Sequence, residues 1–200
     1  MSETETTQLT ERFEDALVYA SQLHSGQNRK RSQVPYIAHL LGVTSLVLED
    51  GGDEDEAIAA LLHDAVEDQG GLKTLETIRA RYGERVATIV SACTDSFTEP
   101  KPPWRERKES YLEILRQSDS SVQRVSLADK VYNARSTLRD VRLEGQAAWS
   151  KFKQGKQGAL WYYHAIIEAL DSRSTSYLLI ELKEIVEELE RTSASQAGGR

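Results

Sequence analysis

Apolar residues recur at the spacing of an α-helix along most of this chain of 200 residues. The first stripe follows the pattern i, i+3, i+4, i+7 and i+10 and consists of Phe13, Ala16, Leu17, Ala20 and Leu23. Such spacing places residues on one face of a helix, whereas a half-buried strand alternates with a period of two. No strand-like alternation persists, and the sequence has no internal repeat or low-complexity segment. The sequence therefore predicts an all-α fold.

Capping residues indicate where two of the central helices begin. Pro35 suits the first turn of a helix that carries His39 and closes at the glycines of residues 50–52. Asp53 and Glu56 have the spacing of a capping box, so the next helix is predicted to begin there.

Glycine and proline punctuate the rest of the chain. Gly83 separates two shorter predicted helices within residues 70–94, and three of the four prolines fall in a loop at 94–104. We expect a mobile loop at residues 143–158, LEGQAAWSKFKQGKQG. Further helices are predicted at roughly 104–117, 121–143, 157–171 and 175–191.

Length and composition indicate a single domain. Two hundred residues suffice to bury a sizeable core, and a hydrophobic fraction of 39% argues against wholesale disorder. Helices flank the proline-containing loop closely, so we predict no domain boundary there. We expect one helical-bundle domain over residues 9–191, a flexible N-terminus at 1–8 and a disordered tail at 192–200.

Charge and cysteine content limit the classes of partner. The net charge of −7 argues against general nucleic-acid binding, although a local basic cluster could receive an anionic small molecule. The single cysteine, Cys93, fits a reducing compartment, and we expect it to be a buried apolar residue. The acidic start resembles no secretory signal, and no run approaches a membrane span. We therefore predict a cytoplasmic protein without nucleic-acid or membrane partners; no feature indicates an oligomeric state.

Residues 60–70, ALLHDAVEDQG, place four ionisable side chains directly after an apolar run. On one continuous helix of ~100° per residue, His63 and Glu67 lie ~40° apart, and Asp64 and Asp68 follow on the same polar side. A solvated amphipathic face explains this pattern by itself. Alternatively, the adjacent His-Asp pair binds a metal ion.

A second segment, RVSLADKVYNARSTL at residues 124–138, places Asp129 and Asn133 on one face of a predicted helix. Asp129 stands within a small, apolar stretch, where an isolated carboxylate is costly to bury. It is therefore expected to pair with Lys130 or an arginine, or to bind a cation.

The third element is His39, in the apolar segment PYIAHLLGV. A lone histidine there is more often a core residue than a ligand. Three helices nevertheless supply a set of two imidazoles and two carboxylates, consisting of His39, His63, Asp64 and Asp129. This set suits Mn²⁺, Fe²⁺, Zn²⁺ or Mg²⁺, and the absence of thiolates argues against a structural zinc site. One ion is favoured, because only His24 and His164 remain as further histidines. We expect His24 to be structural or to face the nucleotide, and His164 to be part of a helix interface.

The order of these residues resembles the HD superfamily of metal-dependent phosphohydrolases, which is named after the His-Asp dipeptide at residues 63–64. The likeness covers residues 10–143 and is greatest to the hydrolase domain of RelA/SpoT proteins and to stand-alone small alarmone hydrolases, including metazoan SpoT homologues. Five blocks carry it: HSGQNRKRSQVPYIAH, ALLHDAVEDQG, RYGERVATIVSACTD, WRERKESYLEIL and LADKVYNARS.

The resemblance implies a role for each matching residue. The metal ligands of the family, typically of one Mn²⁺ ion, match His39, His63, Asp64 and Asp129. The Glu-Asp pair that orients and activates the attacking water matches Glu67 and Asp68. The substrate-binding positions match Arg29, Lys30, Asn133, Lys130 and Tyr132. Among these, the basic pair meets the nucleotide and the asparagine contacts the ribose.

The reaction implied by the resemblance is hydrolysis of guanosine 3′,5′-bis(diphosphate) or its pentaphosphate analogue to GDP or GTP and pyrophosphate. The chain departs from the family at Leu40, where proline is common, and in the short segment RSQV at residues 31–34. Both departures concern the specificity for the base.

General chemistry supports these roles. A divalent ion neutralises phosphate oxygens and activates water near neutral pH, and Glu67 lies within one helical turn of His63. Arg29, Lys30 and Arg31 supply a local positive field, unless they form only a solvated basic loop.

Three alternatives stay open. The substrate could be another phosphorylated nucleotide, such as an adenosine analogue or the 2′-phosphate of NADPH, or the chain could be a catalytically silent nucleotide-binding module. The Glu67-Asp68 pair argues against silence, because a binding module needs no water activator. The aromatic run at residues 161–163 could stack on a base, although such a cluster is more often core.

Overall fold

The computed structural model describes residues 7–30, 32–97, 100–170 and 175–195. Within these ranges the regular elements are helices. In addition, Asn28 and Pro35 form an isolated antiparallel β-bridge. The prediction of an all-α fold is confirmed. The helices in chain order are α1 (Glu11–Leu23), α2 (Ile37–Glu49), α3 (Glu54–Leu62), α4 (Ala65–Asp68), α5 (Gly71–Tyr82), α6 (Glu84–Cys93), α7 (Trp104–Gln117), α8 (Ser120–Glu144), the 3₁₀ helix η1 (Gly145–Lys151), α9 (Gly155–Leu170) and α10 (Tyr177–Ser195).

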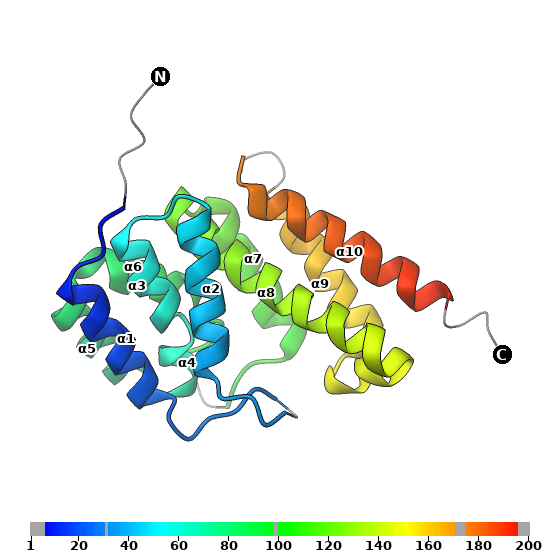
Figure 1. The fold of residues 1–200 in the computed structure, drawn as a ribbon, viewed down its shortest axis with the longest axis horizontal. Helices are drawn as coiled ribbons and strands as arrows, with labels where there is room; N and C mark the ends of the chain where they lie inside the picture. The colour runs from blue at the N-terminus through cyan, green and yellow to red at the C-terminus, as the bar shows by residue number, and fades with distance from the viewer. Residues whose placement is uncertain (1–6, 31, 98–99, 171–174, 196–200) are drawn as a thin grey trace.

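The long helix α8 is the central element (Figure 1). It packs against α2, α3 and α6 on one side and against α10 and η1 on the other. In turn, α3 packs against α1, α2 and α6. The two helices that carry the charged motifs, α3 and α8, therefore lie side by side within the bundle.

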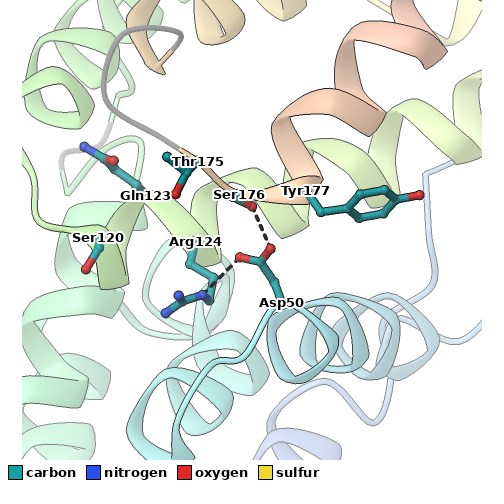
Figure 2. A pocket seen from close by; sticks show the side chains of 7 residues that line it. All are labelled: Asp50, Ser120, Gln123, Arg124, Thr175, Ser176 and Tyr177. Atoms are coloured by element: carbon teal, nitrogen blue, oxygen red, sulfur yellow. Dashed lines mark hydrogen bonds and ion pairs between the residues drawn. The ribbon is translucent and has the colours of Figure 1, made fainter. Parts of the chain in front are cut away.

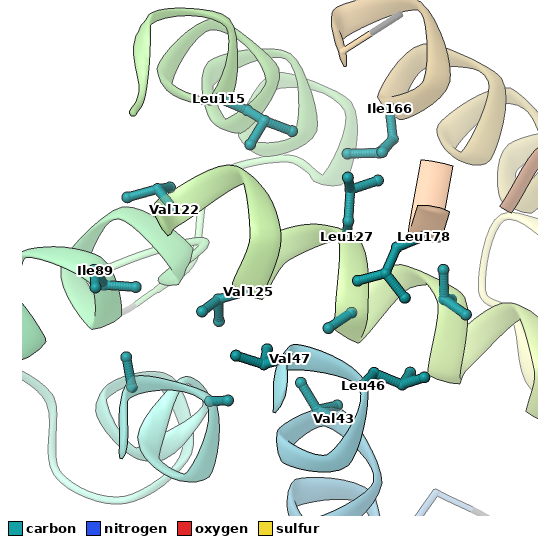
Figure 3. Close-up of a cluster of buried hydrophobic side chains, with 14 of the residues drawn as sticks. Val43, Leu46, Val47, Ile89, Leu115, Val122, Val125, Leu127, Ile166 and Leu178 are labelled. Atoms are coloured by element: carbon teal, nitrogen blue, oxygen red, sulfur yellow. The ribbon is translucent and has the colours of Figure 1, made fainter. Parts of the chain in front are cut away.

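The core forms where α2, α6, α8, α9 and α10 meet (Figure 3). Its aliphatic side chains are nearly inaccessible to solvent, including Val43, Val47, Val125, Leu127 and Ile166. Burying each side chain of this size contributes about 1.5–3 kcal/mol. This packing holds the backbones of α2, α3 and α8 in fixed relative positions, so their polar side chains can meet with defined geometry.

Most helix boundaries follow the capping signals. Asp53 and Glu56 form the predicted capping box, in which each side chain accepts from the other residue's backbone N–H. Gly83 separates α5 from α6 at a φ of 94°. Glycine suits this position because a positive φ strains residues that have a Cβ. The helix predicted at 104–117 is observed over those residues as α7. Pro35 lies just before α2 rather than inside its first turn.

The prediction of a mobile loop at residues 143–158 is wrong. This segment completes α8, forms η1 and begins α9. Trp149 is buried and its ring lies 5.8 Å from that of Phe152. Lys151 also bonds both Asp140 and Glu144 of α8. One buried aromatic side chain thus anchors a segment whose composition is otherwise polar.

The chain ends also differ from expectation. Helix α10 continues to Ser195, where we had expected the tail to begin at residue 192. Gln146 donates to the backbone oxygen of Ser193 at 2.8 Å, which ties this last turn to η1. At the other end, Thr7 donates to the backbone oxygen of Gly52 at 2.9 Å. Residues 1–6 and 196–200 of the expected flexible ends lie outside the described residues. A helix long and apolar enough to cross a membrane is not found in the described part of the chain.

Candidate active site

Four side chains from three elements converge beside the core. His39 comes from α2, His63 and Asp64 from the junction between α3 and α4, and Asp129 from α8. His39 Nε2 lies 3.5 Å from Asp64 Oδ2 and 3.3 Å from Asp129 Oδ1. His63 Nε2 lies 3.1 Å and 3.8 Å from the same two oxygens. The structure therefore brings together the whole set of metal ligands predicted from the sequence.

A break between α3 and α4 shapes this arrangement. We had treated residues 60–70 as one continuous helix, on which His63 and Asp64 diverge by ~100°. Instead α3 ends at Leu62, α4 begins at Ala65, and Asp64 adopts φ −96° and ψ −5°. Because of this break, the two adjacent side chains approach each other within 3.1 Å.

The surroundings of His63 favour a positive charge at its Nε2. Its Nδ1 lies 2.8 Å from the backbone oxygen of Ala60, which only accepts, so Nδ1 carries the hydrogen. Its Nε2 is buried, has no hydrogen-bond partner among the described residues and faces two carboxylates. Burial opposes a charge on the ring, but Asp64 and Asp129 outweigh it and raise the pKa of His63 well above its usual value. A lone pair in this position requires either a proton or a metal ion.

The spacing of the four donor atoms fits a divalent ion. Donors bound at about 2.0–2.2 Å and at right angles to one another lie about 3 Å apart, and wider angles increase this separation. The four separations between histidine nitrogens and carboxylate oxygens, 3.1 to 3.8 Å, are of this size. Asp64 is not part of the tightest group of donors, which consists of the other three residues. His39, His63 and Asp129 are all buried, and their ligand atoms lie within 4.8 Å of one another. These side chains could thus hold a metal ion.

The two carboxylate oxygens of Asp129 have different partners. Oδ2 pairs with Lys130 Nζ at 2.5 Å, so the ion pair considered from the sequence is also formed. Oδ1 accepts from Asn133 Nδ2 at 2.5 Å and faces the two histidines. Burial alone would raise the pKa of Asp129, but Lys130 and the histidines hold it well below its usual range. Asp129 is therefore a carboxylate with one oxygen directed at the two histidines.

Glu67 and Asp68 lie on α4, one turn beyond His63 and Asp64. Glu67 Oε1 lies 2.8 Å from Lys101 Nζ, and Asp68 Oδ2 accepts from Gln27 Nε2 at 2.7 Å. Loss of hydration, with repulsion from Asp64 and Glu67, raises the pKa of Asp68. A cavity of about 330 Å³ adjoins Glu67 and Lys101, with Phe97 also on its wall.

The predicted substrate-binding residues gather near His39. Arg29 Nη2 donates to Asn133 Oδ1 at 2.6 Å, and its guanidinium lies 5.8 Å from the centre of the Tyr132 ring. That ring in turn lies 5.0 Å from His39. Lys30 is exposed on the same loop, whereas Arg31 lies outside the described residues.

The two sequence features that depart from the family differ in position. Leu40 is fully buried in the core, so its side chain points away from solvent. The segment at 32–34 is exposed on the loop before α2. Of the aromatic run, Tyr163 is buried, while Trp161 and Tyr162 are half-buried beside Trp104.

Sequence reasoning missed Tyr36, Gln27 and Lys101. Tyr36 donates to Asp64 Oδ2 at 2.5 Å, and the other two bond Asp68 and Glu67. Tyr36 and Gln27 fall inside the first of the family-like blocks, but no spacing rule marks them as neighbours of the acidic motif.

A second cavity, of about 240 Å³, lies where α2, α8 and the start of α10 meet (Figure 2). Asp50 accepts there from Arg124 at 3.1 Å and from Ser176 at 2.8 Å. None of the predicted site residues lines it.

Comparison with known proteins identifies relatives of this chain. The family model "HD domain" matches residues 16–160. The guanosine-3′,5′-bis(diphosphate) 3′-pyrophosphohydrolase MESH1 of Xenopus tropicalis is 39% identical over 140 residues, 68% of this chain and 73% of that protein. The Homo sapiens protein of the same name is 35% identical over 142 residues, 70% of this chain and 74% of that protein.

A solved structure has a similar fold. It is described as a metazoan orthologue of SpoT that hydrolyses ppGpp. It superposes with a TM-score of 0.75 at 27% sequence identity, covering 92% of this chain and 98% of that one. By its matching family model, its curated relatives and its fold, this chain belongs to the HD-domain family.

Proposed function

We propose that this chain is a metal-dependent pyrophosphohydrolase that removes the 3′-pyrophosphate of guanosine 3′,5′-bis(diphosphate). The observation that carries the proposal is the convergence of two histidines and two carboxylates one helical turn from Glu67 and Asp68. Relatives that match about 70% of this chain are named for this activity. We place the activity in the cytoplasm, as the composition predicts.

The metal in this proposal is one Mn²⁺ ion held by His39, His63, Asp64 and Asp129. Imidazole and carboxylate donors suit this ion, and four protein ligands leave room for water and substrate on a six-coordinate ion. A divalent ion bound here supplies Lewis acidity toward the phosphoryl group and lowers the pKa of water in the site.

The roles of the remaining residues follow from their positions. Glu67 accepts the proton of the attacking water, and Asp68 holds that water in line with the phosphorus. The water oxygen bonds to the phosphorus next to the ribose, the bond from this phosphorus to O3′ breaks, and O3′ takes up a proton. The products are GDP and pyrophosphate.

Arg29 and Asn133 bind the nucleotide beside Tyr132. Arg29 is held in place by its bond to Asn133, and its charge favours the phosphates. The cavity next to Glu67 and Lys101 gives the pyrophosphate group a place with a positive charge on its wall.

A substrate panel tests the proposal. Purified protein with Mn²⁺ is given guanosine tetraphosphate, its adenosine analogue or NADPH, and pyrophosphate and phosphate are measured separately, with EDTA as the control. We expect metal-dependent pyrophosphate release from the guanosine compound. Faster turnover of the adenosine analogue, or phosphate release from NADPH, would assign a different substrate. Binding of all three without turnover would identify a silent nucleotide-binding module.

The proposed ligand set has its own test in Asp129→Ala. The variant removes the carboxylate that faces both histidines, so we expect it to retain far less Mn²⁺ after gel filtration. Asp140→Ala is the matched control, because Asp140 lies on the same helix and pairs with Arg139 and Lys151 rather than with the histidines. Full metal content in Asp129→Ala would contradict the ligand assignment.

A further inference from the structure

A network of three polar side chains connects the end of α1 to Asp68. Gln27 lies at its centre: its Oε1 is 2.7 Å from His24 Nδ1 and 2.6 Å from Gln69 Nε2. Its Nε2 donates to Asp68 Oδ2 at 2.7 Å. Neither His24 nor Gln27 belongs to the ligand set.

The donors and acceptors of this network allow only one arrangement. The Asp68 carboxylate only accepts, so the end of the Gln27 amide that faces it is the NH₂ group; the other end is the oxygen, which accepts from Gln69 Nε2. Because that oxygen only accepts, His24 Nδ1 must carry a hydrogen. A flipped amide would set its oxygen against the Asp68 carboxylate and its NH₂ group against that of Gln69.

His24 is held firmly in this orientation. It is 3% exposed, and its ring stacks on that of Tyr36 at 5.1 Å and 17°. Its Nε2 is buried without a hydrogen-bond partner among the described residues. A hydrogen on that nitrogen would be buried unpaired, so of the two neutral tautomers the one with its hydrogen on Nδ1 is favoured.

Gln27 is the side chain that donates to Asp68. Asp68 is an exposed residue on the single turn of α4, and Asp64 and Glu67 repel its charge. Without a donor, its carboxylate would be free to rotate toward solvent. Gln27 provides that donor from a different part of the chain.

We propose that Gln27 is a positioning residue that holds the Asp68 carboxylate toward the reacting water, and that His24 fixes the orientation of the Gln27 amide. The inference rests on the proposed function, in which Asp68 orients that water. It adds two residues that act on the reaction through Asp68 without touching substrate or metal.

Gln27→Met is the first test. Methionine has nearly the same volume but cannot donate to Asp68 or accept from His24. We expect kcat to fall about tenfold or more, while KM and the affinity for Mn²⁺ stay within error. Gln22→Met is the matched control, because Gln22 is exposed on the last turn of α1. A loss of thermal stability that accounts for the lost activity, or an unchanged kcat, would overturn the proposal.

A pair of variants at His24 separates the hydrogen bond from the ring contact. His24→Phe keeps the ring that stacks on Tyr36 and removes the donor, and it also removes the unpaired Nε2. His24→Asn keeps a donor near the position of Nδ1 and removes the ring. We expect the Phe variant to be folded and slow and the Asn variant to retain more of the kcat. Equal kcat values for both, or a faster Phe variant, would overturn the role of His24.

A measurement on the resting protein distinguishes this inference from the proposed function. The ¹⁵N chemical shifts of His24 report which nitrogen carries the hydrogen. We expect the hydrogen on Nδ1, and a changed Nδ1 shift in Gln27→Met. A hydrogen on Nε2 instead would overturn the network even in an active enzyme. If the wild-type protein released no pyrophosphate, the proposed function would fail, and the tautomer would still decide the geometry of the network.

Discussion

Tyr36 donates its hydroxyl hydrogen to Asp64 Oδ2 at 2.5 Å, the same oxygen that lies near both histidines. Its ring also meets that of His39 edge-on at 5.5 Å. Burial, together with the Asp64 carboxylate, raises the pKa of Tyr36, so its hydroxyl remains a donor throughout the physiological range. One side chain from the loop before α2 thus orients two of the proposed ligands.

We expect Tyr36→Phe to bind Mn²⁺ about tenfold or more weakly than the wild type, because residues that orient metal ligands contribute by this amount. The ring contacts with His24 and His39 should survive, so the fold should be retained. Isothermal titration with Mn²⁺ measures the affinity. Tyr177→Phe serves as the control, since Tyr177 is 65% exposed on α10. Equal affinities in the two variants would show that the Tyr36 hydroxyl has no part in metal binding.

Glu67→Gln is expected to bind Mn²⁺ normally and to lose activity. Glutamine has the same shape but cannot accept a proton, and general bases contribute about 10²–10⁴-fold to turnover. We therefore expect kcat to fall at least about a hundredfold. Metal content and kcat, measured on the same sample, test both parts.

Lys101→Gln is the matched control for Glu67→Gln, because both variants break the ion pair of 2.8 Å between Lys101 and Glu67. If losing that pair explained the effect, the two variants would be equally slow. We expect Lys101→Gln to be the faster one, since its Glu67 carboxylate is intact.

The sequence predicts those parts of this molecule that local rules determine. Helical periodicity and the Asp53–Glu56 capping box place helices correctly because each rule acts within a few residues. His39 and Asp129 could be singled out because polar side chains in apolar helices are costly and so require a partner. The structure brings both into one cluster with His63.

The contacts that support the site could not be predicted in this way. Gln27 and Asp68 are 41 positions apart, and Tyr36 and Asp64 are 28 apart. The partners Gln27 and Tyr36 lie on the loop between α1 and α2, which has no period from which its path could be inferred. The break at Asp64 was also missed, because residues 60–70 contain no glycine or proline before their last position.

Cys93 should react slowly with thiol reagents in the folded protein. Cys93 is half-buried against the core rather than fully buried as expected. Loss of hydration raises its pKa to about 12, so at pH 8 about one thiol in 10⁴ is ionised. A raised pKa disfavours the thiolate, and the rate should therefore climb about tenfold per pH unit up to that value. Iodoacetamide labelling followed by mass spectrometry measures the rate, and the same protein in urea is the control. Because Cys93 is the only cysteine, equal rates in the two states would contradict this pKa.

Gly42 allows the ring of Tyr132 to lie directly against α2. A Cβ at position 42 would fall 2.0 Å from Tyr132 Cε2, and the Tyr132 hydroxyl is meanwhile bonded to the backbone oxygen of Ala38 at 3.2 Å. Gly42→Ala must therefore displace a ring that lies 5.0 Å from His39. Overpacking costs about 1–3 kcal/mol, and the better helix propensity of alanine returns about 1 kcal/mol. We expect urea denaturation to show a net loss of stability on the order of 1 kcal/mol.

A double-mutant cycle at Gly42 tests this explanation directly. In a Tyr132→Ala background the clash is absent and only the helix propensity remains, so Gly42→Ala should stabilise the protein there. Gly26→Ala provides the control for the substitution itself, because a Cβ at position 26 meets nothing within 4 Å. A Gly42→Ala substitution that is equally destabilising in both backgrounds would mean that Tyr132 is not the side chain that requires glycine. If Gly42→Ala lowers the free energy of unfolding in the wild type and raises it in the Tyr132→Ala background, Gly42 is the residue that allows the Tyr132 ring to lie beside His39.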